Sequence, residues 1–119
     1  MKTTSFIINL TSDNPDRLRA FYRDTIGLVP NPEMGDAMAV MPGVNIAIDG
    51  HSDTHGIAKE PQRLLIDFFV DDLQAEQARL EGRGVEFIRK AGREYWGGVI
   101  STFLDPDGNY CQLIEYRPD

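Results

Sequence analysis

The sequence predicts an α+β fold in which two βαβββ modules form a curved mixed sheet with a concave cleft. The two halves of the chain show the same order of elements, which is a strand, a helix and three strands. The segment 7–13 can be laid over 65–71, with a polar residue in mid-strand in both. A unit of this size cannot bury its sheet face alone, so the two halves are expected to pack side by side. We place module one at about residues 1–56 and module two at about 62–119, within a single domain.

The clearest single element is the hairpin that ends the chain. Residues 99–104 are β-branched and aromatic, as is typical of a strand. Asp105 suits the first position of a tight turn, and the Pro-Asp-Gly that follows supplies a fixed φ and then a residue tolerant of positive φ. Residues 110–116 are expected to return as the partner strand.

Module one is predicted to begin with a strand in which apolar side chains alternate with a mixed face that carries Asn9. A helix follows, capped by Asp13 or Asn14, with Pro15 in its first turn and a stop at Gly27. The remaining expected elements are a weak strand and a hairpin, over residues 28–33, 37–41 and 44–48.

Module two is predicted to begin with the strand 64–70, in which Leu65, Asp67 and Phe69 share one face. Asp71 and Asp72 can cap the next helix, with Gln74 completing a capping box. The other expected elements are a polar linker before the module, a strand after the helix and a loop that carries the only tryptophan, over residues 49–61, 85–89 and 91–98.

Composition excludes several classes of function. The net charge of −7 argues against nucleic-acid binding, which needs a basic surface. No apolar segment approaches the length of a signal sequence or a membrane span. Cys111 is the only cysteine, so no internal disulfide can form, and we expect a cytoplasmic protein.

Four motifs in a fixed order resemble those of the vicinal oxygen chelate superfamily, which includes glyoxalase I, bleomycin resistance proteins and extradiol dioxygenases. They span almost the whole chain, at residues 13–28, 68–73, 96–98 and 103–109. The resemblance implies the paired βαβββ fold and a homodimer with clefts at or near its interface.

In metal-dependent members of that superfamily, ligands occupy set positions on the strands. Counted from the motifs, the first and third positions fall on Ile7 and Leu65, which have no lone pair to donate. The last position falls on Gln112, and the second falls near Ala47 or Ile48, next to Asp49. A catalytic divalent ion usually needs three or more protein donors, so the sequence predicts no metal and no other cofactor.

The leading functional interpretation is a metal-free small-molecule-binding protein of the bleomycin-resistance type, with an apolar or aromatic ligand that carries a positive charge in one version. Burial of apolar ligand area would supply affinity, and a few polar groups would set orientation. The predicted ligand-binding residues are Asn9, Asp67, Phe69, Trp96, Tyr110 and Gln112.

Several alternatives stay open. Asp67, in an apolar strand, is expected to form a salt bridge with an arginine such as Arg63 or Arg93, to bind water or a ligand, or to carry a raised pKa. An enzyme would use either a rearranged metal site built from Gln112, Asp49 and a histidine, or acid–base chemistry by Asp67. His51 and His55 could bind a metal, although both lie in the linker. Three residues could instead have purely structural roles. Gln112 could be a strand residue that hydrogen-bonds a neighbour or faces solvent, Trp96 could pack in the core, and Cys111 could be a buried thiol.

Overall fold

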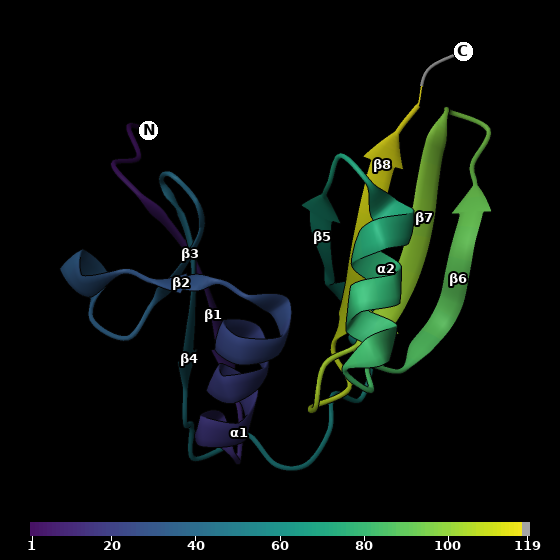
Figure 1. Ribbon diagram of the computed structural model, residues 1–119. Coiled ribbons are helices and arrows are strands. Elements are labelled where there is room, and N and C mark those ends of the chain that lie inside the picture. Colours follow the sequence, from purple (N-terminus) through teal and green to yellow (C-terminus); the bar gives the residue numbers. More distant parts are fainter. Residues whose placement is uncertain (118–119) are drawn as a thin grey trace. The chain divides into compact units, whose positions relative to one another are not determined.

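The computed structural model describes residues 1–117, and its elements fall into two compact units, 1–56 and 57–119. Each unit has the order strand, helix, three strands, and each contains its own four-stranded mixed sheet (Figure 1). The fold is therefore α+β, as predicted, with the eight strands divided between two open sheets. Among residues 1–117, no helix has the length and apolar character needed to cross a membrane.

Module one, residues 1–56, has the strand order β1-β4-β3-β2. Strand β1 runs parallel to β4, while β3 runs antiparallel to both of its neighbours. Its elements are β1 (Phe6–Thr11), α1 (Pro15–Ala20), β2 (Val29–Pro30), β3 (Met38–Met41) and β4 (Val44–Asp49).

Helix α1 begins where the sequence predicts. The Asn14 side chain accepts a hydrogen bond from the Arg17 backbone N–H at 3.3 Å, and Pro15 lies in the first turn. The helix continues as a π-helical turn over Phe21–Ile26 and ends at Gly27, whose φ of 94° is in the left-handed region. Leu18 of α1 and Tyr22 of the π-helical turn are fully buried.

The predicted strand 28–33 is mostly absent. Only Val29–Pro30 pairs with β3, and Pro32–Met34 forms a 3-10 turn capped by the side chain of Asn31. The two prolines explain the difference, because proline has no N–H to donate to a strand partner.

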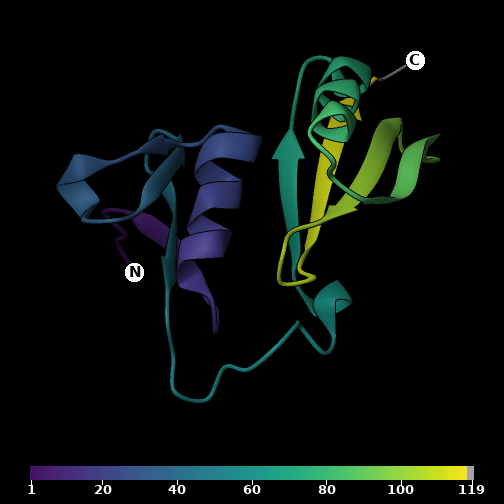
Figure 2. The ribbon, with the colours of Figure 1, turned by 60° about the horizontal axis from the view of Figure 1, so that its bottom comes forward.

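Module two has the strand order β5-β8-β7-β6, with β5 parallel to β8. Helix α2 lies across one face of this sheet (Figures 1 and 2). Its elements are β5 (Leu65–Phe69), α2 (Leu73–Gly82), β6 (Phe87–Arg93), β7 (Gly98–Leu104) and β8 (Tyr110–Tyr116).

Helix α2 is capped by one residue, and the predicted capping box is wrong. Asp72 is the N-cap, and its side chain accepts a hydrogen bond from the Ala75 N–H at 3.1 Å. Because the cap falls one residue later than Asp71, Gln74 is not three residues beyond it, as a capping box requires. The Leu73 N–H donates instead to the buried Glu115 carboxylate at 2.9 Å, which ties the helix to β8.

Strand β6 extends into the region predicted as a loop. It runs from Phe87 to Arg93, so the connection to β7 is only residues 94–97. Two register shifts along β6 allow Gly92 and Arg93 to pair with Ile100 and Val99 despite their weak strand propensity. The longer strand moves Trp96 from a loop to the tip of a tight hairpin.

Candidate functional site

The sheet of module two has one face covered by α2 and one face that α2 leaves uncovered, which we call the open face. At the centre of the open face Ile100, Thr102 and Ile114 are buried, while Leu65, Phe69 and Tyr116 are exposed. On the covered face, Ile66, Phe103 and Cys111 are buried, and Cys111 is fully so. Side chains of paired residues point to the same face, so the register gives the members of the open face. From one edge of the sheet to the other, these residues are Leu65, Asp67 and Phe69 on β5; Tyr110, Gln112, Ile114 and Tyr116 on β8; Gly98, Ile100, Thr102 and Leu104 on β7; and Arg89 and Gly92 on β6.

Four polar residues cross all four strands of the open face in one line, and we call them the polar row. Asp67 pairs with Gln112, Gln112 with Thr102, and Thr102 with Arg89. The neighbouring lines are apolar, since Leu65, Tyr110 and Leu104 lie on one side of the row. Phe69, Ile114 and Ile100 lie on the other side. A line of hydrogen-bonding groups between two apolar lines can orient a ligand whose apolar surface is buried against the sheet.

Within the polar row, some groups are satisfied and others are not. The Gln112 Nε2 donates to Thr102 Oγ1 at 3.1 Å. The Arg89 guanidinium donates to the Glu94 carboxylate at 2.7 Å, which compensates its charge. In contrast, the Asp67 carboxylate makes no hydrogen bond or ion pair with any residue in the range 1–117.

The salt bridge that the sequence suggested for Asp67 is not formed. Arg63 lies 4.0 Å from the Glu60 carboxylate, and Arg93 donates to the Arg117 carbonyl oxygen at 3.3 Å. Arg93 pairs with Val99, which shares the covered face of the sheet with Glu115, so it is on the wrong face to reach Asp67. Partial burial among apolar neighbours, with no compensating cation, raises the pKa of the Asp67 carboxyl above its usual value.

We expect Asp67→Asn to leave the free energy of unfolding unchanged or slightly increased at neutral pH. A carboxyl whose pKa is raised in the folded state binds protons more readily there than in the unfolded chain, so wild-type stability falls as pH rises through the folded pKa. The relative stability of the variant should therefore increase from acid to neutral pH and then level off. Urea denaturation of both proteins between about pH 3 and 7, which brackets a raised carboxyl pKa, measures this difference.

Glu81→Gln is the control of opposite sign. Hydrogen bonds from Gln77 and Lys90 lower the pKa of Glu81, so its contribution to stability is present at neutral pH and lost on acidification. A destabilised Asp67→Asn protein at neutral pH would show that the carboxylate has a stabilising partner in the folded protein.

An aromatic cluster closes one end of the open face. Trp96 stacks on Tyr116, with ring centroids 6.3 Å apart and planes 17° apart. The indole also lies directly over Gly98, where a Cβ atom would be 2.0 Å from its Cη2 atom. Trp96 is 41% exposed, Tyr116 58% and Phe69 67%, so these rings present apolar surface that the fold leaves uncovered.

Five of the six predicted ligand-binding residues belong to this part of the chain. Asp67, Phe69, Tyr110 and Gln112 lie on the open face, and Trp96 lies over its end. Four other residues of this site were not predicted from the sequence, namely Arg89, Thr102, Gly98 and Tyr116. The available signal was the hydroxyl residue in the apolar strand 99–104, but its pairing with Gln112 could be known only from the register of the final hairpin.

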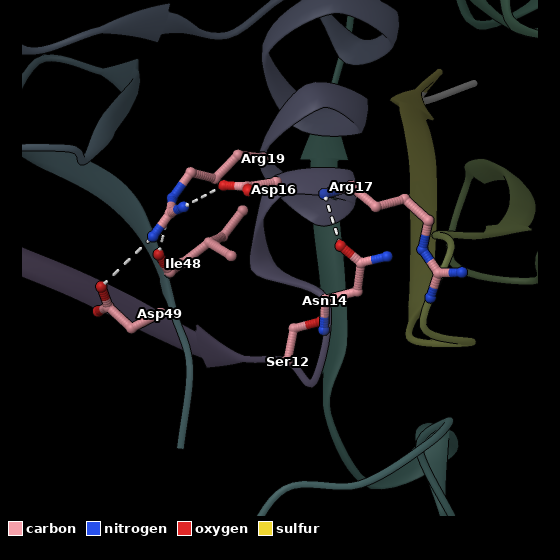
Figure 3. A network of polar contacts seen from close by, with 7 residues as sticks. All are labelled: Ser12, Asn14, Asp16, Arg17, Arg19, Ile48 and Asp49. Atoms are coloured by element: carbon pink, nitrogen blue, oxygen red, sulfur yellow. Dashed lines mark hydrogen bonds and ion pairs between the residues drawn. The ribbon is translucent and has the colours of Figure 1, made fainter. Parts of the chain in front are cut away.

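The sixth residue, Asn9, lies in module one and is held by a polar network of that module. Its Nδ2 donates to the Asp49 carboxylate at 3.1 Å. Asp49 also lies 3.8 Å from the Arg19 guanidinium, which bonds to the Ile48 carbonyl oxygen and to Asp16 (Figure 3). Asn9 therefore links the middle of β1 to the end of β4 through its amide nitrogen, while its amide oxygen has no partner among residues 1–117.

The positions at which metal-dependent relatives hold an ion do not offer a fitting donor set. Ile7, Leu65 and Ala47 have only carbon in their side chains, and Gln112 offers one amide oxygen. His51 accepts a hydrogen bond at Nδ1 from the Asp53 N–H, and Asp49 is held by Asn9 and Arg19. Over residues 1–117, no group of three or more His, Cys, Asp or Glu side chains is placed to hold a metal ion.

The order strand, helix, three strands occurs twice in the chain, which defines a class of α+β proteins built from two βαβββ modules. A family model confirms this assignment: residues 6–113 match the glyoxalase/bleomycin resistance protein/dioxygenase superfamily. The chain belongs to that superfamily.

Several solved structures share the fold of this chain. A superfamily member from Sphaerobacter thermophilus is 23% identical, with a TM-score of 0.71, over 97% of this chain and 98% of that one. TnmS3, an antibiotic binding protein from Streptomyces, is 22% identical over 97% of each chain, with a TM-score of 0.72. Lactoylglutathione lyase from Agrobacterium tumefaciens is 19% identical over 97% and 96%, with a TM-score of 0.68. None of the curated proteins matches the chain.

Proposed function

We propose that this chain is a small-molecule-binding protein that works without a metal ion and binds its ligand on the open face of module two. The observation that carries the proposal is the polar row, flanked by apolar lines and by the exposed rings of Phe69, Trp96 and Tyr116. Binding would come from burial of apolar ligand surface, with Asp67 and Gln112 setting orientation.

Two further features support the proposal. Three of the four metal-ligand positions hold aliphatic side chains and the fourth is Gln112, so one amide oxygen is the only donor at these positions. TnmS3, which shares the fold, is an antibiotic binding protein, and the exposed rings of Phe69, Trp96 and Tyr116 could stack on a planar aromatic ligand. The resemblance to the family supports a homodimer, and the single cysteine is consistent with a cytoplasmic location.

The test uses Trp96, the only tryptophan, as a reporter of binding. A set of planar aromatic compounds that includes antibiotics is titrated into the protein, and indole fluorescence and calorimetry are recorded. We expect at least one compound to bind in a saturable way and to quench Trp96. Exhaustive dialysis against a chelator should leave the affinity unchanged.

Gly98→Ala is the matching variant. Its Cβ would occupy the space of the indole ring, which must move, while the backbone stays as it is because Gly98 is not in the left-handed region. We expect affinity to fall about threefold to tenfold, the value of one aromatic stacking contact. The control is Tyr95→Ala, since Tyr95 is 99% exposed and adjacent to Trp96. Loss of binding on chelation would contradict the proposal. So would a Gly98→Ala protein that binds every compound as tightly as the wild-type protein does.

A further inference from the structure

We propose that the ligand of the open face is an amine whose protonated nitrogen binds between the Asp67 carboxylate and the Gln112 amide oxygen. This inference rests on the proposed function and names the chemical class of ligand for the same site. It follows from the charges, the lone pairs and the apolar surroundings of the polar row.

The charges on the open face do not balance. Arg89 and Glu94 form a pair at 2.7 Å and cancel one another. Of the residues that the register places on this face, Asp67 is the remaining charged group, and it has no partner among residues 1–117. Asp67 is exposed, so a cationic ligand can reach its unpaired carboxylate and form a charge-assisted hydrogen bond with it.

The lone pairs next to Asp67 also require a donor. Gln112 uses its Nε2 to bond Thr102, so the amide group keeps its Oε1 atom as an acceptor. Asp67 and Gln112 are partners in the parallel β5–β8 ladder, on strands about 4.8 Å apart. An ammonium group has three donors and no acceptor, which suits two adjacent acceptors, whereas a carboxylate would meet them without any hydrogen bond.

The surroundings indicate what the amine is attached to. Leu65 and Tyr110 lie on one side of Asp67 and Gln112, while Phe69 and Ile114 lie on the other. From Gln112 to Tyr116 the strand advances by four residues, about 13 Å, and the stacked Trp96 ends that path. Aromatic rings on a short linker would span this distance. The exposed rings of Phe69 and Tyr116 are available for stacking or cation–π contact with such a ligand.

The test compares three probes that share one ring system: 2-naphthylmethylammonium, 2-naphthylmethanol and 2-naphthoate. Equilibrium dialysis near neutral pH gives their dissociation constants. We expect the ammonium to bind about tenfold more tightly than the alcohol, the effect of one charge-assisted hydrogen bond, and the carboxylate to bind most weakly. Asp67→Asn should reduce ammonium affinity to that of the alcohol and leave the alcohol unchanged.

Glu76→Gln is the matched control, because it removes one negative charge from the same module on α2, which covers the other face. Gln112→Leu should weaken ammonium binding as well, by removing the second acceptor. The inference is overturned if the three probes bind equally, if none binds, or if Glu76→Gln has the effect of Asp67→Asn. The proposed function would still hold after such a result if other compounds quench Trp96 fluorescence and Gly98→Ala weakens their binding. Failure of the amine inference is therefore distinguishable from failure of the proposed function.

Discussion

Replacing Phe103 with alanine is expected to lower the free energy of unfolding by about 3–5 kcal/mol, the usual cost of deleting a buried aromatic ring. Phe103 is fully buried on the covered face of the module-two sheet, and its ring centroid lies 5.4 Å from that of Phe87. The cavity would lie beneath α2, where α2 packs on the sheet. Such a loss is a large fraction of the stability of an ordinary domain, so the midpoint of urea denaturation should fall clearly.

Phe69→Ala is the matched comparison, since it removes the same side chain from the same sheet. Phe69 is on the open face and 67% exposed, so the free energy of unfolding should change by about 0.5 kcal/mol or less. Binding of an aromatic ligand should weaken instead. If Phe69→Ala destabilised the protein as much as Phe103→Ala, the open face would be packed in the folded protein and not free for a ligand.

The division of the sheet into two faces could be predicted from the sequence because it depends on local alternation. The pattern of β5 separates Asp67 from Ile66, and the structure confirms that Ile66 is buried while Asp67 is exposed. On β8, alternation alone did not place Gln112, because Tyr110, Ile114 and Tyr116 share its face. The resemblance to the family turned Cys111 toward the helices, and the structure has Cys111 buried and Gln112 on the open face. An alternating pattern survives in the fold because a one-residue slip would turn every side chain to the wrong side.

The composition of the polar row could not be predicted, because it depends on register between distant strands. Arg89 lies opposite Thr102 only through two shifts in the pairing of β6 with β7, and no local pattern encodes them. The placement of Trp96 over Gly98 likewise depends on the tight turn over residues 94–97, where a longer loop was expected. Local propensity was also misleading at Ala91 and Gly92, which form part of a strand through pairing with β7.

The second large effect is expected at Asp105, which begins the turn between β7 and β8. Its side chain is 4% exposed and accepts three hydrogen bonds, from the backbone N–H groups of Asp107 and Asn109 at 2.9 Å each and from Asn109 Nδ2 at 2.8 Å. Asp105→Ala would leave these donors without their acceptor in a buried turn. We expect the free energy of unfolding to fall by about 3 kcal/mol, since hydrogen bonds to a charged group are among the stronger ones and their loss leaves buried donors unpaired.

Asp105→Asn gives an intermediate case, because the amide keeps one acceptor oxygen and replaces the other with a donor. It should cost less than Asp105→Ala in the same urea denaturation experiment. The turn also sets which residue of β7 faces which residue of β8, and Thr102 meets Gln112 only three residues before Asp105 and three residues after Asn109. Both variants should therefore weaken ligand binding in proportion to their loss of stability. A fall of less than about 1 kcal/mol in Asp105→Ala, within the range of a single ordinary hydrogen bond, would mean that strand pairing alone holds this register and that the buried carboxylate is dispensable to the site.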